Sequence, residues 1–107
     1  MKNPLGIHAL VWAGSWNHND IDFAVGSSSK LGFDIIEIPL LNPYHFDVNY
    51  TKKVLENNQI KAVTSLGLSD ETDITSNDHN IRNNGAKLLT KALEVTSQIG
   101  ANYMGGV

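Results

Sequence analysis

Glu37 and His8 are the two side chains whose places in the sequence indicate chemistry. Glu37 stands in DIIEIP (residues 34–39), among isoleucines that are typical of a buried β-strand. A carboxylate is rarely buried without a partner, so this position calls for a specific environment. His8 has a similar place in the apolar stretch GIHALVW (residues 6–12). Both groups can hydrogen-bond a ligand when the fold turns them toward a pocket.

The other polar clusters do not match known site patterns. The acidic segment 70–78 lacks the central glycine and the terminal glutamate of an EF-hand calcium loop. His18 and His79 stand in NHND and NDHN, which are typical of turns and helix caps. Gly105 and Gly106 are not followed by the Lys-Ser/Thr of a phosphate-binding loop. None of these clusters therefore predicts a metal, phosphate or acid–base site.

The composition restricts the class of protein. With 107 residues the chain is long enough for one modest domain. Its net charge of −3 and its lack of a Lys/Arg cluster argue against a nucleic-acid partner. It has no cysteine, which excludes disulfides and thiolate metal sites. The apolar stretch 5–14 is too short to span a bilayer, and Lys2 alone does not make the basic start of a signal peptide. We therefore expect a cytoplasmic protein with no membrane partner.

Short apolar strands alternate with helical patterns along the chain. The predicted strands cover residues 6–12, 34–39, 61–66 and 102–107. Between them, apolar residues at i, i+3 and i+4 spacing predict helices over residues 21–31, 48–57 and 81–99. The candidate caps and stops of the first and third helices are Asn19 or Asp20 with Gly32, and Asn77 or Asp78 with Gly100. This order predicts right-handed crossovers and a parallel sheet.

The predicted sheet fits either an open doubly wound fold or part of a (β/α)8 barrel. The period of two puts Ile36 and Ile38 on one face of the second strand and Glu37 on the other, and it groups His8 with Leu10 and Trp12 in the first strand. Both faces of an open, helix-covered sheet should be apolar, whereas the inward face of a barrel can be polar near its mouth. We therefore expect an α/β fold, the N-terminal half (about four β/α units) of a (β/α)8 TIM barrel, with Glu37 and His8 facing inward.

The length of the chain bears on this expectation. A barrel of this kind needs about 250 residues. We therefore expect residues 1–107 to be a single partial domain, with the rest of the barrel absent from this chain.

Several stretches resemble one enzyme family in the same order. They are GIHALVWAGSW, LGFDIIEIP, AVTSLGLS, NDHNIRNNGAKLLTKALE and IGANYMGGV. Together they are similar to the D-tagatose 3-epimerase and D-allulose (D-psicose) 3-epimerase family of the xylose-isomerase-like TIM barrels. The resemblance implies a ketose 3-epimerase, which is an isomerase of carbohydrate metabolism that acts on a small ketose and forms a homo-oligomer, a dimer or tetramer.

The resemblance also implies a metal-dependent reaction. A divalent metal (Mn2+, Mg2+ or Co2+) binds O2 and O3 of the ketose, and two glutamates remove and return the C3 proton through a cis-enediolate. The family's metal ligands and its acid–base pair lie on later strands, beyond residue 107. By this resemblance the chain contributes pocket wall and no catalytic group.

The resemblance assigns the substrate pocket to six residues: His8, Trp16, Glu37, Ser65, Gly105 and Gly106. Trp16 matches a tryptophan that shields the hydrophobic side of the sugar, and Ser65 matches a small residue near the distal hydroxyls. Gly105 and Gly106 match small residues that let the substrate approach the backbone. His8 replaces the aromatic residue usual at its position, which leaves the preferred ketose open.

The same positions can serve the fold alone, and two other functions also fit the sequence. Glu37 and His8 can act as structural groups, Trp16 as hydrophobic cover, and the paired glycines as a bulge or a point of close packing. One alternative function is a hydroxypyruvate isomerase-like or inosose-type enzyme of the same superfamily. The second is a non-catalytic half-barrel that binds a sugar or pairs with itself.

Overall fold

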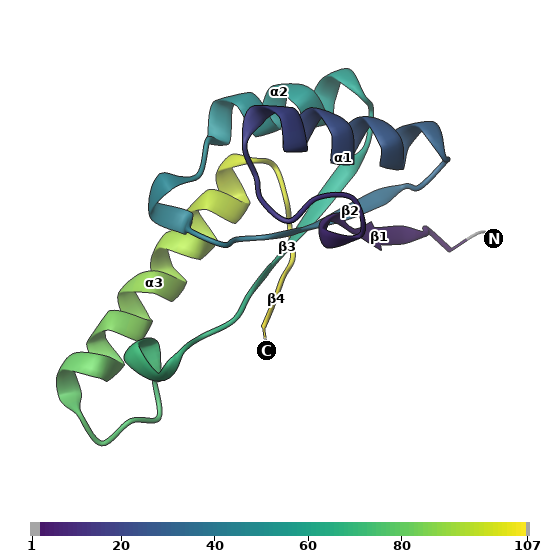
Figure 1. The fold of residues 1–107 in the computed structure, drawn as a ribbon. Helices are drawn as coiled ribbons and strands as arrows, with labels where there is room; N and C mark the ends of the chain where they lie inside the picture. The colour runs from purple at the N-terminus through teal and green to yellow at the C-terminus, as the bar shows by residue number, and fades with distance from the viewer. Residues whose placement is uncertain (1–2, 107) are drawn as a thin grey trace.

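The computed structural model describes residues 3–106, in which a parallel sheet of four strands packs against three helices. The strands pair in chain order and are β1 (Gly6–His8), β2 (Ile35–Pro39), β3 (Lys61–Leu66) and β4 (Met104–Gly106). The helices α1 (His18–Lys30), α2 (Val48–Asn57) and α3 (His79–Gln98) connect successive strands (Figure 1). The predicted alternation of strands and helices is confirmed, as is the parallel sheet. Val107, the last residue of the fourth predicted strand, lies outside the described residues.

The helices cover only one face of the sheet. Ile36 and Ile38 of β2 are fully buried on that face, in a core shared with Ile21 and Val25 of α1. Thr64 of β3 is buried on the same side, where its hydroxyl lies 2.7 Å from that of Thr96 in α3. Within residues 3–106, no element covers the opposite face, which we call the bare face (Figure 1). The predicted separation of Ile36 and Ile38 from Glu37 is confirmed.

The first strand is shorter than predicted. It ends at His8, and Ala9–Val11 form the 3-10 turn η1. The turn forms because the His8 ring accepts a hydrogen bond from the Leu10 N–H at 3.1 Å, and the Trp12 N–H donates to the carbonyl of Ala9 at 2.9 Å. Such local bonds compete with a strand ladder. The prediction that Leu10 and Trp12 continue the face of His8 is therefore wrong.

Trp12 belongs to the helix layer instead. Its indole N–H donates to the buried Ser28 hydroxyl of α1 at 2.9 Å, and its ring meets Phe23 edge-on at a centroid distance of 6.0 Å. The side chain of Leu10 is about half exposed, at 52%.

The ends of the helices follow ordinary capping rules. Asn17 caps α1 by accepting the Asp20 N–H, so the predicted cap at residue 19 or 20 lies two or three positions too late. Asp78 caps α3 as predicted. Gly32 and Gly100 follow α1 and α3 with φ of +88° and +87°, the left-handed conformation that glycine adopts at a helix end.

The long helix α3 extends beyond the sheet (Figure 1). Its N-terminal part packs against the β3–α3 connection, which includes the 3-10 turn η3 (Asp70–Thr72). Gly85 permits this contact, because a Cβ there would lie 2.1 Å from the carbonyl oxygen of Thr72.

None of the helices within residues 3–106 combines the length and the apolar composition needed to cross a membrane.

Candidate functional site

Polar side chains meet on the bare face, where the edge strand β1 pairs with β2. The register places His8 of β1 beside Glu37 of β2, and Glu37 beside Val63 of β3. These three residues line a shallow hollow of about 350 Å³ together with Gly6, Ile7 and Ile35. The sequence prediction that His8 and Glu37 share one face of the sheet is confirmed.

The contact between His8 and Glu37 has a defined proton arrangement. Nε2 of His8 lies 3.1 Å from Oε2 of Glu37, with the two side chains 33% and 42% exposed. Nδ1 of His8 accepts the Leu10 N–H, so the neutral imidazole carries its proton on Nε2, next to the carboxylate. The hollow therefore presents a carboxylate whose charge is partly balanced by one imidazole N–H.

Ser65 and Gly105 extend the bare face toward the C-terminal ends of the strands. Ser65 lies beside Pro39 and Gly105, two positions along β3 from Val63, and so on the same face as Glu37. Gly106 pairs with the buried Leu66, which places position 106 on the opposite face. The structure therefore brings four of the six predicted site positions onto one face.

The paired glycines are not required by packing among residues 3–106. A Cβ at Gly105 would lie 4.0 Å from the carbonyl oxygen of Thr64, and one at Gly106 would lie 3.7 Å from that of Leu66. Both distances are ordinary contacts. The open space above Gly105 leaves room for a ligand beside the backbone.

Trp16 lies apart from the hollow, in the connection between β1 and α1. Its indole N–H donates to the hydroxyl of Thr51 in α2 at 3.2 Å, and its ring packs against the core under α1 and α2. It is not among the residues that line the hollow. Its predicted contact with a substrate stays a prediction.

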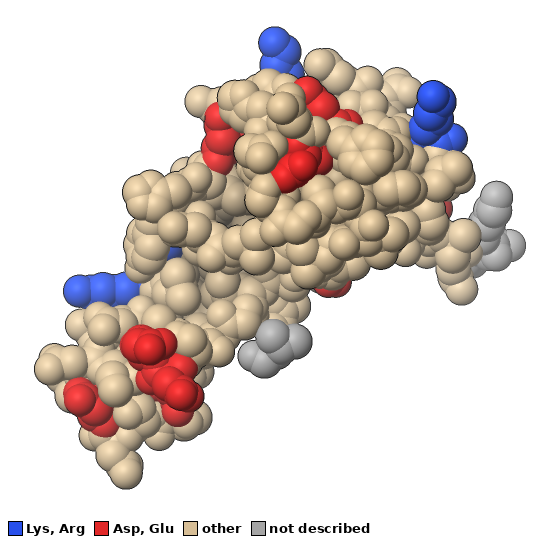
Figure 2. Space-filling view, in the orientation of Figure 1, with Lys and Arg blue, Asp and Glu red and all other residues tan. Residues whose placement is uncertain are grey.

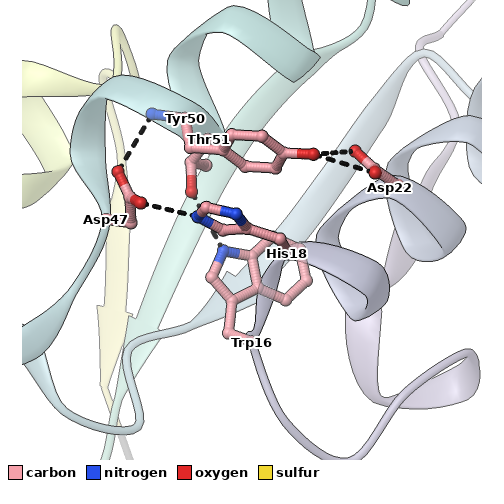
Figure 3. A network of polar contacts seen from close by, with 6 residues as sticks. All are labelled: Trp16, His18, Asp22, Asp47, Tyr50 and Thr51. Atoms are coloured by element: carbon pink, nitrogen blue, oxygen red, sulfur yellow. Dashed lines mark hydrogen bonds and ion pairs between the residues drawn. The ribbon is translucent and has the colours of Figure 1, made fainter.

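A second polar network lies beside Trp16 and was missed in the sequence (Figure 3). Nε2 of His18 is 2.7 Å from Oδ2 of Asp47, and the His18 ring stacks on Tyr50 at a centroid distance of 3.7 Å. The Tyr50 hydroxyl donates to the carboxylate of Asp22, with both oxygens at 2.8 Å. We call His18, Asp22, Asp47 and Tyr50 the α1–α2 clasp, because they join the N-terminal ends of these helices.

Hydrogen bonds shift the ionisation of two members of the clasp. The bond from His18, with a second from the Tyr50 N–H, holds the pKa of Asp47 below its usual value. The hydrogen bond to the Asp22 carboxylate raises the pKa of Tyr50. The one sequence signal for this region was the spacing of Asp47 and Tyr50, which fits a helix N-cap. Residues 18 and 47 are 29 positions apart, so no local pattern could pair them.

The described residues do not form a metal site. Within residues 3–106, no three side chains of His, Asp or Glu come together as metal ligands. The acidic group of η3 stands at the end of the molecule where α3 begins (Figure 2). Its neighbour Asp73 accepts hydrogen bonds from the N–H and hydroxyl of Thr75, which lower the pKa of Asp73 and stabilise a local turn.

Known proteins share both the sequence and the fold of this chain. Ketose 3-epimerase of Arthrobacter globiformis is 39% identical over 96% of the chain, and L-ribulose 3-epimerase of Methylomonas sp. is 42% identical over 95%. A crystal structure of D-allulose 3-epimerase from Methylomonas sp. in complex with D-allulose covers 97% of the chain with a TM-score of 0.94 and 41% identity. No family model matches the chain.

The match involves only part of each relative. The chain spans 36% of the length of these three proteins. Its four strands and three helices superpose on the TIM-barrel fold of the solved epimerase over nearly all of their length. The resemblance predicted from the sequence is thus confirmed, and the chain is homologous to the N-terminal part of the ketose 3-epimerases.

Proposed function

We propose that the full-length protein epimerises a free ketose at C3, and that these 107 residues supply part of the wall of its substrate pocket. One observation carries the proposal. The chain matches a D-allulose 3-epimerase in complex with its sugar at 41% identity and a TM-score of 0.94. Identity at this level over almost the whole chain supports a shared reaction as well as a shared fold.

The bare face suits a neutral, hydroxyl-rich ligand. The Glu37 carboxylate accepts hydrogen bonds from sugar hydroxyls, and the Ser65 hydroxyl both donates and accepts. Gly105 leaves the backbone open next to Ser65. His8 holds one oxygen of Glu37, so the other oxygen is the natural acceptor for a ligand O–H.

The charges on this face oppose a phosphorylated ligand. Glu37 is an anion, and the one lysine of β3, Lys61, begins the strand at the end opposite to Ser65. Among residues 3–106, the ends of the strands near Ser65 therefore offer no Arg or Lys of the kind that a bound phosphate usually requires. The proposed substrates are the free sugars D-tagatose, D-fructose, D-allulose and L-ribulose.

The described residues contribute binding and orientation rather than bond-breaking. They do not fit the divalent metal (Mn2+, Mg2+ or Co2+) that the family resemblance implies, so its ligands are expected beyond residue 107. When bound, that metal would acidify the C3 proton of the ketose. His8, Glu37, Ser65 and Gly105 would hold the sugar from the bare face, and Trp16 would cover its hydrophobic side; Gly106 lies on the opposite face and is left out of this proposal. We also propose that the full-length protein is cytoplasmic and forms a homo-oligomer.

An assay of the purified full-length protein tests this function. It would be incubated with each free ketose and with the corresponding sugar phosphates, and the C3 epimers would be separated by chromatography. We expect interconversion of D-fructose with D-allulose, or of another free ketose with its C3 epimer. A strong preference for a phosphorylated sugar would refute the free-ketose assignment. Isomerisation of hydroxypyruvate or an inosose without C3 epimerisation would favour the alternative enzymes.

A further inference from the structure

The connection between β1 and α1 is bonded to α1 through Ser15 and Asn17, whose side chains contact Asp20, but among residues 3–106 only Trp16 bonds it to α2. The Trp16 indole N–H reaches the Thr51 hydroxyl at 3.2 Å, the long end of the range for N–H···O hydrogen bonds. Thr51 itself is fully buried in α2 and offers a fixed acceptor. Whether the indole stays on that acceptor depends on how firmly its segment is held against α2.

The α1–α2 clasp supplies that attachment. His18 follows Trp16 by two residues, and its ring contacts both Asp47 and Tyr50. Asp47 and Tyr50 belong to the same end of α2 as Thr51 (Figure 3). One turn of α2 therefore holds Trp16 and His18 at the same time.

Two residues of the clasp, Asp47 and Tyr50, hold the His18 ring. Asp47 caps α2 by accepting the Tyr50 N–H through Oδ1, which leaves Oδ2 for His18. Tyr50 lies under the His18 ring and donates its hydroxyl to Asp22, which is one turn along α1 from His18. The stacking on Tyr50 thus fixes the plane of the His18 ring, and the contact with Asp47 fixes where its Nε2 points.

We propose that His18 and Asp47 are positioning residues that hold the indole of Trp16 on Thr51, and with it the part of the pocket wall that Trp16 forms. The role of Trp16 in the pocket wall rests on the proposed function, in which Trp16 covers the sugar. His18 and Asp47 are 59% and 47% exposed in their side chains, so their contact serves to place a loop rather than to stabilise the core.

Two variants of the full-length protein isolate the contact. His18→Ala removes the imidazole. Asp47→Asn keeps a good N-cap for α2 but removes the carboxylate that pairs with His18. His79→Ala is the matched control, because His79 is also an exposed first residue of a helix but lies outside the clasp.

Hydrogen exchange of the tryptophan indole N–H, followed by NMR on protein labelled with 15N-tryptophan, gives a readout independent of activity. The Trp16 signal would be assigned with Trp16→Phe. We expect exchange at Trp16 to become about fivefold faster in both clasp variants, the scale of one lost hydrogen bond. Trp12, whose indole bonds to Ser28, should be unchanged, as should both signals in His79→Ala.

Steady-state kinetics on the same proteins separate the two parts of the proposal. A KM raised severalfold with nearly unchanged kcat would support both parts. Faster exchange with an unchanged KM would support the positioning role and refute the contact of Trp16 with the sugar. Unchanged exchange at Trp16 in both clasp variants would overturn the proposal. If the full-length parent protein shows no epimerase activity, the proposed function is refuted, whereas the exchange result for Trp16 still stands.

Discussion

Replacing Gly85 by alanine should disrupt the packing of α3 on the β3–α3 connection. The added Cβ would lie 2.1 Å from the carbonyl oxygen of Thr72 and 2.8 Å from Cγ2 of Ile74. Ordinary contacts begin near 3.4 Å, so the Thr72 carbonyl must move by about 1.3 Å. Because the obstacle is backbone, no side-chain rotation can relieve the clash.

The size of the effect follows from two opposing terms. Alanine in place of glycine inside a helix gains about 1 kcal/mol of stability. Forcing an atom into a packed interface costs about 1–3 kcal/mol, and a backbone clash this close lies at or above the upper end. We therefore expect Gly85→Ala to lower the free energy of unfolding by about 2 kcal/mol.

Gly26→Ala in α1 is the matched control. The nearest atom to its added Cβ is Oδ1 of Asn58 at 3.9 Å, an ordinary contact. Only the helix-propensity gain applies, so this variant should be more stable by about 0.5–1 kcal/mol. The same chemical change is thus expected to have opposite signs at the two positions.

Thermal unfolding and limited proteolysis of the full-length variants measure both effects. Gly85→Ala should lower Tm by about 4–8 °C and Gly26→Ala should raise it slightly. In Gly85→Ala, protease cleavage should also increase within residues 67–77, because the displaced carbonyl belongs to that segment. The reasoning is refuted if Gly85→Ala is as stable as the parent and shows no new cleavage there.

Three further predictions concern the pocket, the clasp and the isolated chain. Trp16→Ala in the full-length enzyme should raise KM more than it lowers kcat, because shape and dehydration act on ground and transition states alike; an unchanged kcat/KM would show that Trp16 is only hydrophobic cover. The pKa of Asp47 in the folded protein is lower than the ordinary aspartate pKa of 3.8, so the ionised carboxylate stabilises the fold at any pH above 3.8. This contribution is lost as the pH falls from 3.8 through the lower pKa of the folded state. The Tm difference between parent and Asp47→Asn should therefore shrink as the pH falls below 3.8, and a difference that stays constant down to about pH 2 would contradict the assignment. The 107-residue chain by itself should associate and show no epimerase activity, because β1 and β4 are open edges of the sheet and the bare face is uncovered; light scattering that shows a monodisperse monomer with cooperative unfolding would disprove this.

The sequence alone predicted the parts of the fold that depend on local patterns. The bounds of α2 and β3 agree with residues 48–57 and 61–66, because each is a periodic stretch between turn residues. The burial of Ile36 and Ile38, and the placement of Glu37 on the other face, followed from the period of two in a strand. The order of these elements predicted a parallel sheet, and the polar residues Glu37 and His8 on its strands favoured a barrel over an open sheet. The resemblance to the epimerase family rested on particular sequence stretches, such as GIHALVWAGSW and IGANYMGGV.

Only the tertiary structure decided the contacts that join separate elements. The sequence placed His8 and Glu37 on one face, but their 3.1 Å contact depends on the register between β1 and β2. The end of β1 at His8 depends on a side-chain bond to the Leu10 N–H, which an apolar pattern does not reveal. The pairing of His18 with Asp47 depends on how α1 packs on α2. Local patterns determine backbone conformation because they act over a few residues, whereas a site is built by packing that brings distant residues within bonding distance.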